Sequence, residues 1–168
     1  GLCRTEHMFF DEARIHLVRQ MILAKDKEAR EKPLQELKKF QKEDFEGIFK
    51  VMDGRPVTVR LLDPPLHEFL PDNESAIIEL AQDFKMTVDE LSNLIANLRE
   101  INPMLGHRGC RLGITHPEIY KMQVQAIAEA AMKVKQVNVE IEIPLVGEVR
   151  ELAFLREMVE ETIREYGE

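Results

Sequence analysis

Residues 56–63 constrain the fold of this chain more than any other segment. They have the period-two pattern of a β-strand, and two prolines follow them directly. Successive side chains between residues 56 and 63 fall on opposite faces of a strand, with Val57, Val59 and Leu61 on one face and Thr58, Arg60 and Leu62 on the other. The run Asp63-Pro64-Pro65 ends the strand, because proline donates no hydrogen bond to a ladder and restricts the residue before it. The apolar face suits packing against helices, which leaves Arg60 on the opposite face near the strand's end.

Other segments have strand patterns, and helical patterns separate them. Residues 1–6 are expected to be the end of a strand, as if the chain begins inside a larger architecture. Residues 139–145 alternate with period two, and the irregular, Gly-rich segment 102–114 holds a further candidate strand. Strands that alternate with helices imply parallel pairing through right-handed crossovers, so we predict a single α/β domain.

The helical segments are marked by apolar spacing and by their ends. A first helix begins near Asp11, residues 25–32 form a charge-rich connection, and Pro33 suits the first turn of a second helix that ends at residues 52–54. Two short amphipathic helices follow between residues 76 and 98, the second behind a capping box from Thr87 to Glu90. Further helices are expected from residues 115–118 onward and from 148 to 166.

Composition excludes several classes of protein. The chain has 168 residues, a formal net charge of -8 and 44% hydrophobic residues, which fits one domain with a real core and disfavours a general nucleic-acid binder. No apolar run approaches the ~20 residues of a membrane span, and residues 1–8 resemble neither a signal nor a transit peptide. Two cysteines, Cys3 and Cys110, are too few for a disulfide framework. We therefore expect a soluble cytoplasmic domain with no nucleic-acid or membrane partner.

Arginines near strand ends are the most informative candidates for chemistry. Arg60 needs an anionic partner if it is buried, since desolvating a guanidinium is unfavourable. Arg4 repeats this arrangement in the first strand, and Arg108 and Arg111 lie in a segment rich in glycine. Because the planar guanidinium binds phosphate or carboxylate bidentately, these arginines indicate a localised anion site. The alternative is an internal ion pair of Arg60 with Asp63 or Glu6.

Other reactive residue types show no functional spacing. The five histidines lack metal-ligand spacing, so no metal site is expected within the chain. Cys3 and Cys110 are interpreted as small core residues rather than nucleophiles. The segment 106–113 matches neither a Walker loop nor a dinucleotide-binding fingerprint.

Three long blocks of sequence resemble the pyruvate, phosphate dikinase family. They are GLCRTEHMFF at residues 1–10, RLLDPPLHEFLP at 60–71 and NPMLGHRGCRLGI at 102–114, and the resemblance continues through 117–120 and 143–146. Phosphoenolpyruvate synthase and the first enzyme of the sugar phosphotransferase system share a shorter Gly-Leu-x-Arg-x-Glu pattern. The run LDPPLHEF distinguishes the dikinase family from both.

The resemblance implies a fold and a reaction. The chain is similar to part of the C-terminal phosphoenolpyruvate/pyruvate-binding domain, a partial (β/α)8 TIM-type barrel with roughly strands two to five and a helical insertion after the second strand of the fragment. The family interconverts ATP, pyruvate and phosphate with AMP, phosphoenolpyruvate and diphosphate through a phosphohistidine on a mobile domain. By resemblance, Arg4, Arg60 and Arg108 bind the substrate's phosphoryl and carboxylate groups, and Asp63 supports them.

The resemblance also implies that parts of the enzyme lie outside residues 1–168. The family's Mg2+ ligands and its proton-donating cysteine correspond to positions beyond Glu168, and no block here resembles the nucleotide or phosphohistidine domains. We therefore expect a fragment of a homodimeric phosphotransferase that is inactive alone and that associates through its open strand edges. One departure is Glu142, where the family usually has Met. Its side chain either faces the barrel interior beside the arginines or marks looser packing there.

Two alternatives stay open at this point. One is a fragment of a related enzyme such as phosphoenolpyruvate synthase, which uses the same substrate in a different reaction. The other is a non-catalytic interaction module whose contact surface is the helical segment from Ala76 to Leu98.

Overall fold

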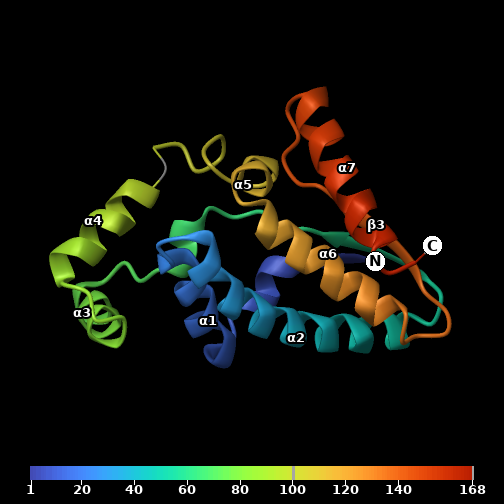
Figure 1. Cartoon of the computed structure of the whole chain (residues 1–168), viewed down its shortest axis with the longest axis horizontal. Coiled ribbons are helices and arrows are strands. Elements are labelled where there is room, and N and C mark those ends of the chain that lie inside the picture. Colours follow the sequence, from blue (N-terminus) through green and yellow to red (C-terminus); the bar gives the residue numbers. More distant parts are fainter. Residues whose placement is uncertain (100, 168) are drawn as a thin grey trace.

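The computed structural model describes residues 1–99 and 101–167 and shows a small parallel sheet covered by helices (Figure 1). In chain order the elements are β1 (Leu2–Arg4), the 3₁₀ helix η1 (Thr5–Phe9), α1 (Glu12–Leu23), α2 (Lys27–Met52), β2 (Pro56–Arg60), the 3₁₀ helix η2 (Leu66–Phe69), α3 (Glu74–Asp83), α4 (Val88–Leu98), α5 (Cys110–Thr115), α6 (Pro117–Ala131), β3 (Asn138–Glu142) and α7 (Val149–Arg164). The α/β class predicted from the sequence is confirmed.

The three strands are parallel and lie in the order β1-β2-β3, as the alternation of strands and helices predicts. Their register places Arg4 beside Arg60 and Arg60 beside Glu142. Side chains of neighbours in register share one face of a sheet, so the three charged residues form a row at the carboxyl end of the strands. Glu142 therefore lies on the arginine face, in register with Arg60.

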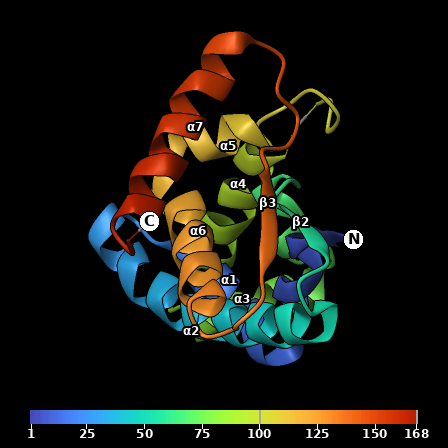
Figure 2. The same cartoon turned by 90° about the vertical axis from the view of Figure 1, so that its right-hand side faces the viewer.

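The other face of the sheet packs against helices, as the alternating pattern of β2 predicts. Val57 and Val59 are fully buried, and the long helices α2 and α6 lie side by side beneath them (Figure 1). Figure 2 shows β3 with α6 and α7 on the same side of the strand. The core on this side includes Phe45, Phe49 and Tyr120. One face of the sheet is thus buried against helices, and the opposite face carries the arginines that are candidates for binding.

Helix α2 begins earlier than the sequence analysis predicts. Asp26 caps it, accepting a hydrogen bond from the Ala29 amide at 2.7 Å, so Pro33 lies inside the helix and not in its first turn. Of the predicted connection at 25–32, residues 25 and 26 precede the helix, whereas residues 27–32 form its first turns. Pro33 is buried within the helix, where it donates no backbone hydrogen bond.

The candidate strand at residues 102–114 is wrong, because this segment forms turns and the short helix α5. Gly109 adopts φ +57° and turns the chain into α5, which buries Cys110 and Leu112. The next glycine, Gly113, allows the close approach of α6, since a Cβ there would lie 2.4 Å from the Tyr120 ring. Gly109 thus serves the turn into α5, and Gly113 serves close packing between helices. A period-two pattern of apolar residues indicates neither role.

The other predicted helix ends are confirmed. The capping box from Thr87 to Glu90 opens α4, with the Glu90 amide donating to the Thr87 hydroxyl at 3.2 Å. Helix α6 begins at Pro117 and α7 spans most of the segment from 148 to 166. Among the described residues, no helix combines the length and the apolar character that crossing a membrane requires.

A charged contact joins α2, α6 and the end of α7. Glu129 accepts hydrogen bonds from Lys38 at 2.9 Å, Lys42 at 2.8 Å and the Tyr166 hydroxyl at 3.0 Å. Burial alone would raise the pKa of Glu129, but the two lysines and the tyrosine outweigh it and lower that pKa to about 2. The ionised carboxylate therefore stabilises the native packing of these helices.

This contact predicts a loss of stability in acid. A carboxyl group with a depressed pKa stabilises the fold fully above its unfolded pKa of ~4.3 and loses that contribution as the pH falls toward 2. The Glu129→Gln variant should be less stable than the wild type at pH 7, and the difference should shrink as the pH falls through this window. Denaturant titrations at several pH values measure it, with the exposed Glu157→Gln as control. A difference that stays constant with pH would contradict the account.

Candidate anion-binding site at the carboxyl end of the sheet

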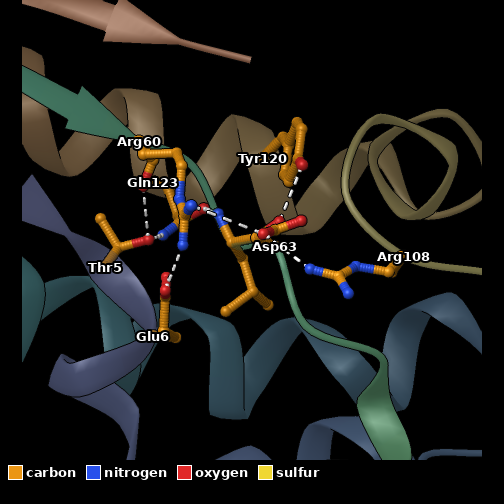
Figure 3. Close-up of polar contacts among 8 residues, drawn as sticks. Thr5, Glu6, Arg60, Asp63, Arg108, Tyr120 and Gln123 are labelled. Atoms are coloured by element: carbon orange, nitrogen blue, oxygen red, sulfur yellow. Dashed lines mark hydrogen bonds and ion pairs between the residues drawn. The ribbon is translucent and has the colours of Figure 1, made fainter. Parts of the chain in front are cut away.

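Arg60 is the centre of a polar cluster where β1 and β2 end (Figure 3). Its guanidinium donates to the Glu6 carboxylate, and its Nη1 lies 3.6 Å from the Asp63 Oδ2. Only 20% of the Arg60 side chain is exposed, so both contacts are largely screened from solvent. The two internal ion pairs that the sequence left open are therefore both present, and they hold the guanidinium in one place.

Asp63 connects Arg60 to a second arginine from a distant part of the chain. Arg108 Nη2 donates to the same Asp63 Oδ2 at 2.8 Å, while Arg108 Nη1 donates to the Pro103 carbonyl at 2.9 Å. The Gly109 amide donates to the Asp63 carbonyl at 2.8 Å, which fixes the backbone of the two segments against each other. One carboxylate thus positions two guanidinium groups (Figure 3).

A network of hydrogen bonds between neutral groups holds the backbone at the end of β2. Gln123 of α6 accepts from the Leu62 amide at 2.9 Å and donates to the Thr5 hydroxyl at 3.0 Å, and Thr5 donates to the Arg60 carbonyl at 2.8 Å. The Tyr120 hydroxyl donates to the Leu62 carbonyl at 2.8 Å. Burial, with a smaller contribution from Asp63, raises the pKa of Tyr120, so its hydroxyl stays protonated as a donor. These bonds satisfy the backbone beyond the strand, where no ladder partner exists.

Four buried polar atoms of the cluster have no partner among the described residues. They are Glu6 Oε2, Arg60 Nε, Asp63 Oδ1 and Arg108 Nε. Buried polar atoms are nearly always hydrogen-bonded, so two free guanidinium N–H groups at one site are typical of a place where a ligand completes the bonding. The chemistry of these donors suits an anion with several oxygen atoms.

The structure brings together some of the residues singled out from the sequence and not others. Arg60, Asp63 and Arg108 are in contact, whereas Arg4 is in register with Arg60 but exposed. Arg111 instead holds the loop carbonyls of Leu105 and Gly106. Cys110 is fully buried, and burial followed by the nearby Glu151 raises the pKa of its thiol, which agrees with a core role.

The sequence analysis missed the network partners Thr5, Tyr120 and Gln123 as site residues. The available signal was a glutamine on the apolar face of α6, one turn after Tyr120, where a polar side chain needs a specific partner. Glu6 was considered only as an ion-pair partner of Arg60.

The described residues do not form a magnesium site. No group of three His, Cys, Asp or Glu side chains within residues 1–99 and 101–167 is arranged to hold a metal ion. The two carboxylates of the cluster, Glu6 and Asp63, are both bound by guanidinium groups, which disfavours a cation at the same oxygens. We therefore derive no step through a metal from these residues.

The candidate site lies at the carboxyl ends of parallel strands, which is where α/β proteins commonly place their ligand sites. The model of the family described as the PEP-binding domain of PEP-utilising enzymes, where PEP stands for phosphoenolpyruvate, matches residues 1–168. The chain belongs to this family.

Its relatives include enzymes named pyruvate, phosphate dikinase. The chain is 53% identical over 166 residues to that of Clostridium symbiosum, 56% identical over 159 residues to the chloroplastic enzyme of Flaveria trinervia, and 47% identical over 170 residues to that of Rickettsia prowazekii. These matches cover 96%, 90% and 98% of this chain but only 19%, 17% and 19% of the relatives. The chain therefore spans about a fifth of the length of the proteins it matches.

Substitution of Gly109 tests how the site is built. In Gly109→Ala a Cβ would lie 2.8 Å from the Leu145 Cβ and 3.0 Å from the Pro144 carbonyl oxygen, at a backbone conformation that disfavours alanine. We expect the free energy of unfolding to fall by about 2–4 kcal/mol in denaturant titrations.

The matched control is Gly47→Ala in α2. A Cβ there has nothing within 4 Å, so the substitution should raise the free energy of unfolding by about 0.5–1 kcal/mol. Equal effects of the two substitutions would argue against a special role for the turn at Gly109.

Proposed function

We propose that this chain is part of a pyruvate, phosphate dikinase and that it supplies arginines of the phosphoenolpyruvate/pyruvate site. The whole enzyme would interconvert ATP, pyruvate and phosphate with AMP, phosphoenolpyruvate and diphosphate. The observation that carries the proposal is the Arg60–Asp63–Arg108 cluster, with unpartnered guanidinium N–H groups at the carboxyl ends of parallel strands. The names and identities of the relatives support it.

The finer architecture is part of the same proposal. We propose that the three parallel strands and their helices are a portion of a (β/α)8 barrel, with α3 and α4 as a helical insertion after β2. Within the described residues β1 and β3 are the edge strands of the sheet, and a barrel would need a further strand beside each of them. The phosphohistidine domain, the homodimer, the cytoplasmic location and the Mg2+ ion belong to the proposed whole enzyme.

In the proposed mechanism the arginines act by electrostatic stabilisation. Arg60 and Arg108 would bind the phosphoryl oxygens of phosphoenolpyruvate. Arg4, in register with Arg60 on the edge strand β1, would contact the same substrate from the outer side. Phosphoryl transfer between pyruvate enolate and the enzyme places charge on oxygens that fixed guanidinium groups stabilise in the transition state. The ion pairs with Glu6 and Asp63 hold Arg60 in place before substrate binds, so little reorganisation is needed.

The reaction itself is tested with the full-length protein. ATP, pyruvate and phosphate should give AMP, phosphoenolpyruvate and diphosphate, and diphosphate formation should require added phosphate. Formation of AMP, phosphoenolpyruvate and free phosphate without diphosphate would instead identify a phosphoenolpyruvate synthase. No phosphoenolpyruvate under either condition would overturn the proposal.

Removal of the Arg60 side chain should abolish most of this activity. We expect Arg60→Ala in the full-length enzyme to lower kcat/KM for phosphoenolpyruvate by about 10²–10³-fold, because a fixed cation is lost from the transition state. Arg60→Lys should recover only part of the loss, since an ammonium group cannot reproduce the bidentate geometry. Arg55→Ala, an exposed arginine just before β2, is the control and should be active. Full activity of Arg60→Ala would remove this residue from the mechanism.

Asp63 should act as a positioning residue. Asp63→Asn keeps the shape of the side chain but weakens its hold on both guanidinium groups. We expect about a 10–100-fold lower kcat/KM for phosphoenolpyruvate with no change in the KM for ATP. Asp72→Asn, at an exposed position, serves as the control. An equal effect on both substrates would indicate general damage to the fold rather than a role at this site.

A further inference from the structure

A cavity lies away from the arginine site, and none of the arginine-site residues lines it. It has a volume of about 810 Å³ and separates α4 from the end of α1 and the start of α6. Its floor is apolar and includes Met21, Ile22, Leu66 and Ile119, with Leu94 of α4 on the opposite wall. Figure 1 shows that α3 and α4 stand at one end of the molecule, away from α7. The volume and the lining are those of a site for a small organic molecule.

The charges around this cavity are mainly positive. Lys25 and Lys85 are exposed at its edge, and their side chains form no hydrogen bond or ion pair with the described residues. Arg30 lies deeper, next to His116, and its charge is balanced by an ion pair with Glu118, so the free positive charges are those of the two lysines. The one acidic lining residue, Glu90, is engaged in the capping box of α4. A local positive rim on a chain of net charge -8 favours an anionic group at the opening.

The backbone at Lys85 supports a role for its side chain. Lys85 follows α3 in the left-handed region, with φ +52°, and the Met86 amide donates to the Ala81 carbonyl at 2.9 Å, as in a Schellman motif. Glycine is the favoured residue at this position because a side chain makes the conformation unfavourable. A lysine here is held against local preference, with its side chain lining the cavity.

We propose that this cavity is a second ligand site, which takes an amphipathic organic anion. The apolar body of the ligand lies on the floor between α1, α4 and α6, and its carboxylate, sulfonate or phosphate group lies between Lys25 and Lys85. The ligand bridges α4 to the body of the domain, which few other contacts connect. This proposal does not depend on the reaction proposed above.

The probe is 8-anilinonaphthalene-1-sulfonate, an aromatic body with one sulfonate, titrated into the full-length protein and followed by fluorescence. Lys25→Glu combined with Lys85→Glu should weaken its binding by at least about tenfold, because two attractive charges become repulsive. Asn97→Trp, which fills the cavity from α4, should weaken it similarly. Lys39→Glu, at an exposed position of α2, should bind the probe as the wild type does. Unchanged binding in both cavity variants, or equal loss in Lys39→Glu, would overturn the proposal.

A second pair of variants separates ligand binding from stability. Lys85→Gly should raise the melting temperature, since glycine relaxes the left-handed position, and should at the same time weaken probe binding. Asp53→Gly is the matched control, because Asp53 also lies in the left-handed region, at φ +46°, but far from the cavity in the fold. It should raise the melting temperature without affecting the probe. Wild-type probe affinity in Lys85→Gly would contradict the role assigned to this lysine.

Discussion

The carboxylate of Asp63 is the contact on which the site depends. It lies between the end of β2 and two prolines, and a single oxygen is shared by guanidinium groups from Arg60 and Arg108. Its backbone carbonyl also accepts the Gly109 amide, so the same residue fixes the loop that carries Arg108. Like charges on two nearby arginines would otherwise repel each other, and the shared anion allows them to approach. The geometry of the anion site thus follows from one residue and the strand end that places it.

The proposed anion site is consistent with the balance of charges in this acidic chain. Glu6, Asp63 and Glu142 lie close to Arg60, either in contact or in register on the same face. These carboxylates reduce the net charge of the cluster but fix its donors in place, and the Nε atoms of Arg60 and Arg108 stay without a partner among the described residues. Positioned donors stabilise developing charge better than mobile ones, since they need not reorganise during the reaction. Glu142 adds a further negative charge to this row.

Much of this arrangement could be predicted from local patterns in the sequence. The alternation in β2 assigned Arg60 to the face away from the helices, which the structure confirms. The Asp-Pro-Pro run predicted a strand end at Asp63, whereas β2 already ends at Arg60. The segment 102–114 could not be assigned by the same reasoning, because its glycines serve a turn at Gly109 and close packing at Gly113. The start of α2 was missed because the cap at Asp26 precedes a run of charges with no apolar period. The bonds of Gln123 join α6 to η1 and to the end of β2, and no spacing within one segment reveals such long-range contacts.

The central claim is that Arg60 binds phosphoenolpyruvate from a position that Asp63 fixes. Calorimetric titration of phosphoenolpyruvate into the full-length wild type, Arg60→Ala, Asp63→Asn and the double variant tests it most directly. The account predicts that each single substitution weakens binding and that the double variant binds no more weakly than Arg60→Ala, because Asp63 then has no Arg60 to position. Wild-type affinity in Arg60→Ala, or losses that simply add in the double variant, would contradict it.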